Sequence, residues 1–476
     1  MEEYSYKFFW EEIMTEKKNT RVSLSMAVTL SIGAIIGSGI FVYTGFGVQY
    51  CGAAIPLAFV LAAILTCFMT LPSMQLGSAI PATGGTYMYV SRFTHPFFGF
   101  IQILNSLIGT LNIGILTGTF GVYFAAAFLS NSVIGGRIAG VVMLVILAVI
   151  ATKGIRLSGR LQQVIVLVLC GSLIIYTLSG FNDLNSEYFT FAKMMKPLGG
   201  ISGLWAAIAV VRYTLQGGTI ALAYAEEMEN PGRDVPLSFF IGVGVTAVIY
   251  AVVGWIFVAT APYDVIAGKS LSVSAEMIMS GVWLKIFLVG GGMLATMTTL
   301  NGSLIMYPRI HWAAARDGIW PEIFAKKNKN NVPAIILWLV TAVGVAVTMS
   351  GVSVIALFKW VSVPALLIGP IYMIPGAILP FKLPNCHKKA YFRMNKWVTL
   401  VISIISAGIS FTLGLSIFKR MTTASWIGMI CFFTAGTIYW FIRTNYLKKK
   451  KDIDLVKKMR GYHPLWLEIE NGKSAE

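Results

Sequence analysis

The stretch from residue 22 to residue 91 contains no aspartate, glutamate, lysine or arginine. A soluble domain carries roughly a quarter charged residues, so this stretch is not expected to fold in water. It is long enough for two membrane crossings of about 20 residues each with a turn between them. Over the whole chain of 476 residues, 56% are hydrophobic and 12% are charged. These features exclude a soluble enzyme and favour a protein that folds in a lipid bilayer.

Apolar runs separated by charged or Pro/Gly-rich breaks recur as far as residue 442, and no polar linker divides them. They predict an all-α polytopic membrane protein with twelve transmembrane helices in one membrane domain. The expected spans are roughly 23–48, 54–80, 97–129, 136–153, 160–181, 201–226, 236–261, 281–306, 333–350, 354–380, 397–418 and 423–442.

The formal charge of +17 is spread over the segments between these spans. With the N-terminus in the cytoplasm, 28 of the 37 Lys and Arg residues fall on the cytoplasmic side. The positive-inside rule therefore predicts that both termini lie in the cytoplasm. We expect the protein in the plasma membrane. A charge distributed in this way does not favour nucleic-acid binding. We also expect no cleaved signal peptide, because the chain begins with a mixed-charge segment.

The five cysteines and four histidines are dispersed along the chain without metal-ligand or redox spacing. Neither a disulfide framework nor a metal site is indicated, and no cofactor is expected. Paired mid-membrane acids and a His/Cys cluster are also missing from the sequence, so an intramembrane enzyme is not favoured.

The first span contains three glycines in seven residues, within the segment 33–41 (GAIIGSGIF). Glycine in a helix interior costs up to about 1 kcal/mol relative to alanine. One explanation is close helix packing through small residues. The other is an unwound helix, because irregular backbone at this depth must line protein or a water-filled cavity.

The sixth span contains a second polar, glycine-rich segment, 213–219 (YTLQGGT). It lies five spans after the first, so the two helices cross the membrane in opposite directions. Paired interrupted helices in two inverted halves are the best sequence indication of a transporter's central site. Together the two segments favour a binding site over packing alone.

The backbone expected at such a site suggests its ligand. A half-helix beginning near Gly37 presents unpaired amides and a positive dipole end, which suit a carboxylate. The half-helix ending near Tyr213 presents free carbonyls, which suit an ammonium. An amino acid zwitterion satisfies both.

Four motifs occur in order along the chain: 37–41 (GSGIF), 81–89 (PATGGTYMY), 226–231 (EEMENP), and 301–304 (NGSL) followed by Arg309 and 315–318 (ARDG). With these motifs the chain resembles the amino acid-polyamine-organocation (APC) superfamily of transporters, and within it the L-type amino acid transporter branch. The resemblance implies a LeuT-like fold of two inverted five-helix repeats, at 23–181 and 201–380, with helices 1 and 6 unwound at the midplane. Helices 11 and 12 would occupy 397–442, between a cytoplasmic tail at 1–22 and a basic cytoplasmic tail at 443–476.

The resemblance also implies substrate-binding positions. The carboxylate would meet the backbone at Gly37, Ser38 and Gly39, and the ammonium would lie near the carbonyls of Ile35 and Tyr213. Tyr213 would also act as the aromatic gate. The remaining positions implied to line the pocket are Gly109, Thr110, Gly114, Gly217, Thr219 and Ser303. For Thr110 and Ser303 the alternative is a hydroxyl that bonds only its own helix backbone.

The coupling ion is open between H⁺ and Na⁺. Thr298 and Thr299 occupy the place where sodium-coupled members of the fold have oxygen ligands, and helix packing is their alternative role. Some relatives carry a lysine seven residues after the glutamine that matches Gln162. Here that residue is Leu169, which does not favour coupling through a lysine.

Glu226 and Glu227 stand at the C-terminal end of the sixth span, where negative charge opposes the helix dipole. They suggest a cytoplasmic gate with a cation such as Lys18 or Arg21; solvated loop charge is the alternative. We expect no disulfide-linked heavy subunit, because segment 130–136 contains no cysteine.

These features predict a secondary active transporter of L-amino acids that works by alternating access, as an exchanger or a symporter. Neutral amino acids are favoured because no acid lies deep in any predicted span. Transport of cationic amino acids or polyamines stays as an alternative, and so does a membrane amino acid sensor. Arg212, directly before the second break, would either attract an acidic side chain, line the outer vestibule, or snorkel or bond to carbonyls.

Overall fold

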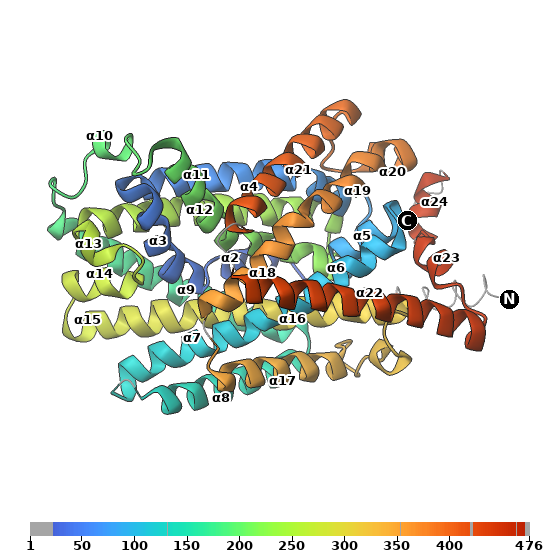
Figure 1. The fold of residues 1–476 in the computed structure, drawn as a ribbon, viewed down its shortest axis with the longest axis horizontal. Helices are drawn as coiled ribbons and strands as arrows, with labels where there is room; N and C mark the ends of the chain where they lie inside the picture. The colour runs from blue at the N-terminus through green and yellow to red at the C-terminus, as the bar shows by residue number, and fades with distance from the viewer. Residues whose placement is uncertain (1–21, 131, 353, 419–421, 463, 472–476) are drawn as a thin grey trace.

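The computed structural model describes residues 22–471 apart from 131, 353, 419–421 and 463. The regular elements of this part of the chain are helices, with two isolated β-bridges between loops. Figure 1 shows most of the long helices running roughly along one direction of an elongated bundle. The expected tail at 1–22, with Lys18 and Arg21, lies outside the described residues except for Val22.

The helices that build the bundle and its ends are α2 (Leu24–Ile35), α3 (Ser38–Cys51), α4 (Ile55–Ala79), α5 (Thr86–Phe93), α6 (Pro96–Gly109), α7 (Leu111–Phe128), α8 (Val133–Thr152), α9 (Ile155–Gly180), α10 (Phe191–Met194), α11 (Gly200–Arg212), α12 (Pro231–Ala259), α13 (Tyr263–Ile266), α14 (Leu271–Ile278), α15 (Gly281–Ile286), α16 (Leu294–Asp317), α17 (Ala334–Ser350), α18 (Val354–Leu367), α19 (Gly369–Lys382), α20 (Pro384–Lys389), α21 (Lys396–Phe418), α22 (Thr423–Lys451), α23 (Leu455–Arg460) and α24 (Pro464–Glu470). Two 3₁₀ segments, η4 (Tyr213–Ala223) and η5 (Ala225–Glu227), follow α11.

Within the described residues, 11 helical stretches are long and apolar enough to cross a membrane. One further apolar helix, α17, is slightly shorter. The chain is therefore a multi-pass, all-α membrane protein, as its apolar runs predict. The inverted-repeat relation between the two halves stays a prediction.

Two helices extend beyond their predicted ends. The eighth span was expected to end near residue 306, but α16 continues to Asp317 and ends at Gly318, whose φ is 105°. Arg309 and Asp317 in its last turns are buried and form ion pairs, so the helix can continue past its apolar run without leaving these two charges unpaired. The last span was expected to end near 442, but α22 reaches Lys451. Four lysines form its last turn, and their positive charges interact favourably with the negative end of the helix dipole.

The first span is broken. α2 ends at Ile35, α3 begins at Ser38, and the backbone of Ile36 and Gly37 is not helical (ψ of 83° and −155°). The sixth span changes character at the corresponding segment, where the α-helix ends at Arg212 and continues as the 3₁₀ segment η4. Both glycine-rich segments therefore interrupt α-helical structure.

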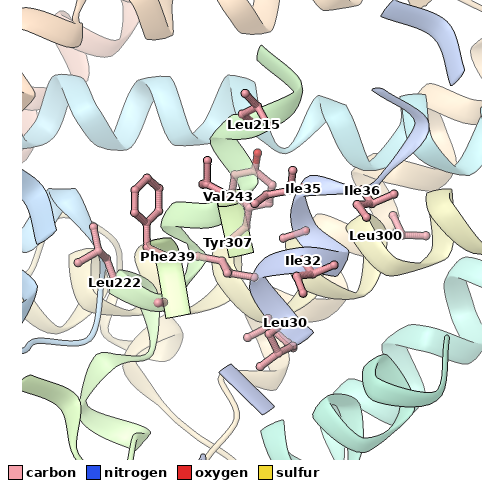
Figure 2. Close-up of a cluster of buried hydrophobic side chains, with 14 of the residues drawn as sticks. Leu30, Ile32, Ile35, Ile36, Leu215, Leu222, Phe239, Val243, Leu300 and Tyr307 are labelled. Atoms are coloured by element: carbon pink, nitrogen blue, oxygen red, sulfur yellow. The ribbon is translucent and has the colours of Figure 1, made fainter. Parts of the chain in front are cut away.

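The broken first span lies inside the bundle, where α2 packs against α9, α12, α16 and η4. Figure 2 shows Ile35 of α2 beside Val243 of α12, with Leu215 of η4 above them. These side chains are buried. The apolar contacts hold the helical parts in place, so the break is confined to Ile36 and Gly37.

The chain's C-terminal segment folds against one end of the bundle, which we call the tail end (Figure 1). Trp466 of α24 is 0% exposed and its ring lies 6.3 Å from that of Tyr89 in α5. The carboxylate of Glu470 accepts hydrogen bonds from the amides of Asn385 and Cys386 at the start of α20. α24 thus ties α5 to α20.

Candidate functional site

A cavity of about 340 Å³ lies where the two interrupted spans meet. Its wall comes from the breaks themselves and from α4, α6, α7, α16, α18 and α19. Its volume is at the lower end of the range of small-molecule sites. The cavity can therefore hold a molecule of amino acid size.

The two breaks approach each other so closely that some positions require glycine. A Cβ on Gly217 would lie 2.1 Å from the carbonyl oxygen of Ala34 in α2. A Cβ on Gly39 would lie 2.7 Å from Cγ2 of Thr214 in η4. The glycines therefore allow close packing of the two spans and also lie at the breaks. Close packing and helix unwinding, the two explanations offered by the sequence, both apply here.

The structure brings most of the predicted substrate-binding residues to this cavity. Those that line it are Ile35, Gly37, Gly39, Gly109, Tyr213, Gly217, Thr219 and Ser303. Segments more than 250 residues apart in sequence meet in this wall. Their roles toward a substrate stay predictions.

Two of the predicted substrate-binding residues, Thr110 and Gly114, are not among those that line the cavity. The Thr110 hydroxyl donates to the Leu107 carbonyl of its own helix (2.6 Å) and does not line the cavity. Gly114 faces α17, where its Cβ would lie 2.4 Å from Val347. The side chain of Ser38 is outside the described part of the structure, although its backbone begins α3.

The backbone at the first break offers donors more readily than acceptors. The carbonyl of Ile35 accepts hydrogen bonds from the Gly37 amide (2.9 Å) and the Tyr250 hydroxyl (2.7 Å), so both of its lone pairs are engaged. The first amides of α3, from Ser38 onward, have no partner within their own helix. The cavity therefore presents a helix N-terminus suited to an anionic group.

Thr298 and Thr299 of α16 face the same break. The Thr298 hydroxyl lies 2.9 Å from the Ile36 carbonyl and 2.7 Å from that of Ala295, and it can donate to one of them at a time. The Thr299 hydroxyl lies 3.3 Å from the Gly33 carbonyl. Hydroxyl oxygens of α16 and carbonyl oxygens of the first span thus lie together beside the unwound segment.

Two aromatic residues that the sequence did not single out, Tyr43 and Tyr307, also shape the cavity. Tyr43 of α3 and Tyr213 both line it, with ring centroids 6.0 Å apart in an edge-to-face arrangement. Tyr307 lines it from α16, and its hydroxyl is the atom nearest to a Cβ placed on Gly109. Tyr307 is four residues after Ser303, so helical periodicity from a predicted site residue was the available signal.

The two predicted gate acids lie toward the tail end. Glu227 forms a two-point ion pair with Arg309 of α16, at 2.6 and 3.0 Å. Glu226 accepts a hydrogen bond from the Thr83 amide (3.0 Å). The suggested partners Lys18 and Arg21 lie outside the described residues, whereas Arg309 is a partner that the sequence did not indicate.

Further contacts close the tail end around these acids. The amide of Val22 donates to the Glu227 carbonyl at 2.7 Å. The amides of Gly84 and Gly85 donate to carbonyls of η4 at 3.3 and 3.2 Å. The residue that precedes the first span and the loop of the second motif, 81–89, are therefore fastened to the end of the sixth span.

The fold and the cavity define a multi-pass helical membrane protein with a small-molecule site between interrupted helices. The family model for amino acid permeases matches residues 22–442. The chain belongs to the amino acid permease family, within the APC superfamily, as its motifs indicate.

Several characterised proteins are similar to this chain. One is a branched-chain amino acid permease of Lactococcus lactis, with 24% identity over 67% of this chain and 73% of the relative. Another is a vacuolar cationic amino acid transporter of Arabidopsis thaliana, with 26% identity over 65% and 54%. A methylthioribose transporter of Bacillus subtilis has 24% identity over 87% and 91%. Their names give three kinds of substrate, so the family supports amino acid transport without fixing which substrate is carried.

Proposed function

We propose that this protein is a secondary active transporter that moves neutral L-amino acids across the plasma membrane by alternating access, as an exchanger or a symporter. The observation that carries the proposal is the cavity at the meeting of the two interrupted spans, with the N-terminus of α3 in its wall. Unpaired amides and the positive end of a helix dipole favour the α-carboxylate that all amino acids share.

The substrate's ammonium would lie toward the second break. Because the Ile35 carbonyl is already engaged twice, we assign the ammonium to carbonyls near Tyr213, where α11 gives way to η4. Thr219 and Ser303 line the same cavity. The described wall contains no carboxylate for a cationic side chain, which favours neutral side chains over cationic ones.

We propose that the contacts at the tail end form the cytoplasmic gate. This follows from the basic loops and tail, which the positive-inside rule places in the cytoplasm. The Glu227–Arg309 pair and the loop contacts of Val22 and Gly84 would have to separate for substrate to leave on that side. Tyr43 and Tyr213 would cover the opposite end of the cavity.

The proposal is tested with purified protein in liposomes, by uptake of labelled leucine, serine, lysine and glutamate with and without unlabelled amino acid inside. We expect uptake of neutral amino acids, and dependence on preloading would indicate exchange. Tyr213→Ala should abolish most uptake, whereas the matched Tyr446→Ala on the exposed face of α22 should not. Binding without uptake would instead indicate a sensor, and preferred uptake of lysine or polyamines would establish the cationic alternative.

Sodium coupling is the candidate that the oxygens around Thr298 and Thr299 favour. Thr298→Ala should then reduce the sodium dependence of uptake, whereas Thr298→Ser, which keeps the hydroxyl, should preserve it. If uptake is independent of sodium in the unmodified protein and responds to a proton gradient, the two threonines serve only to join α16 to the first span.

A further inference from the structure

Arg212 carries a charge into the wall of the central cavity. It is the last residue of α11, directly before the second break, and it is 7% exposed. Among the described residues that line the cavity, Arg212 alone has a charged side chain. The electrostatic character of the cavity is therefore set largely by this guanidinium.

This guanidinium has no counter-charge in the part of the chain that the structure describes. Its Nε is buried and has no hydrogen-bond acceptor, and the side chain forms no ion pair with a described residue. A buried charge without a partner is costly. An ionisable side chain at membrane depth marks a candidate site for a substrate or an ion of opposite charge.

The two other deeply buried arginines show the contrast. Arg92 is 7% exposed and bonds Asp317 at 2.7 and 2.9 Å. Arg309 is 5% exposed and bonds Glu227 at 2.6 and 3.0 Å. Each has a carboxylate in a two-point contact, whereas Arg212, buried to the same degree, has none.

The structural alternatives for Arg212 do not match these facts. A snorkelling arginine extends its head to the membrane surface and leaves it exposed, but Arg212 is almost entirely covered. A carbonyl-bonded arginine would show a backbone acceptor, and none is present among the described residues. What the guanidinium meets is the cavity.

We propose that Arg212 is a substrate-specificity residue that binds the side-chain carboxylate of an acidic amino acid. This inference rests on the proposed transport function and extends its substrate range from neutral to dicarboxylic amino acids. The α-carboxylate would bind the N-terminus of α3, and the second carboxylate would take the two-point contact that guanidinium groups favour. The same charge would exclude cationic amino acids, because the described cavity wall offers no carboxylate to offset it.

The test compares pairs of nearly equal shape that differ in charge. Purified protein in liposomes is assayed for uptake of labelled glutamate and glutamine, and of aspartate and asparagine. A second readout, which does not require translocation, is competition of the unlabelled compounds against uptake of a labelled neutral amino acid. Arg212→Gln removes the charge and keeps a polar side chain, Arg212→Lys keeps the charge, and thermal unfolding in detergent confirms that each variant is folded.

We expect glutamate to compete more strongly than glutamine in the unmodified protein. In Arg212→Gln this preference should fall by about tenfold or more, as expected for the loss of a hydrogen-bonded charge pair. Arg212→Lys should retain part of it. If the acid and amide compete equally, or if their ratio is the same in Arg212→Gln, the inference is wrong.

A small inorganic anion could complete Arg212 in place of a substrate carboxylate. Uptake of the neutral amino acid is therefore measured in chloride and in gluconate. A chloride requirement that disappears in Arg212→Gln, without a preference for acids, would overturn the assignment to substrate. Absence of uptake or competition for every amino acid would refute the proposed transport function itself, which separates the two failures.

Discussion

Replacement of Gly217 by alanine tests whether the two breaks must touch. An added Cβ would lie 2.1 Å from the carbonyl oxygen of Ala34, 2.4 Å from its carbonyl carbon and 2.8 Å from the amide nitrogen of Ile35. Ordinary contacts begin at 3.4 Å, so α2 and η4 would have to separate by roughly 1 Å. All three obstructing atoms belong to backbone, which cannot rotate away.

We expect Gly217→Ala to destabilise the fold by about 1–3 kcal/mol, the range found for overpacked cores, and to impair uptake strongly. The measurement is the midpoint of thermal unfolding of the purified protein, followed by uptake in liposomes. Two glycines supply controls. Gly171→Ala, within α9, meets no atom within 4 Å and should be neutral or stabilising by up to about 1 kcal/mol.

The second control, Gly218→Ala, is adjacent in sequence to the tested position. Its Cβ would approach side-chain atoms of Phe239 at 3.1 Å and Ile35 at 3.2 Å, and these can move by a few tenths of an ångström. We expect a smaller loss than for Gly217→Ala. If Gly217→Ala unfolds at the temperature of the unmodified protein and transports normally, the close approach of the two breaks is refuted.

Three other predictions concern the tail end. Trp466→Ala should make the C-terminal segment sensitive to protease, because this large side chain is fully buried. Its removal costs about 3–5 kcal/mol in a packed core. An unchanged rate of cleavage would contradict the packing of α24 against the bundle. Asp317→Asn should lower the unfolding midpoint by leaving Arg92 buried with a neutral partner, and the double variant with Arg92→Met should recover part of the loss if the pair is coupled. Burial lowers the pKa of His387, so its neutral form favours the folded state and the stabilisation should be lost as pH falls below about 6.5; the unfolding midpoint of His387→Gln should depend less on pH between 8 and 5, and equal slopes would contradict this.

Much of the fold could be predicted because the bilayer makes strong demands on sequence. Apolar runs of sufficient length identify nearly every long helix, and the glycines near Gly37 locate the first break to within a residue or two. Boundaries were predicted less well where protein contacts replaced lipid. α16 continues to Asp317 because its charges have buried partners, and these partners are distant in sequence.

The candidate site was predicted in part. Residues predicted from the family motifs, such as Gly39, Tyr213 and Ser303, line the cavity. Tyr43 and Tyr307 were missed, since aromatic residues in apolar helices are common and only the position of the cavity distinguishes these two. The hydroxyls of Thr110 and Ser303 both bond carbonyls of their own helices, and the sequence left this alternative open for each of them.

The sequence by itself determined that the chain crosses a membrane many times, where two helices are interrupted and which family it belongs to. These properties depend on local composition and short motifs. Lipid requires apolar residues along each span, and a break in a helix is marked by glycine and polar residues. Only the tertiary structure decided which charges are paired. Glu227 has Arg309 and Arg92 has Asp317, while Arg212 faces the cavity with no counter-charge among the described residues. Pairing depends on which side chains from distant segments come within about 3 Å of each other, and no local pattern encodes that.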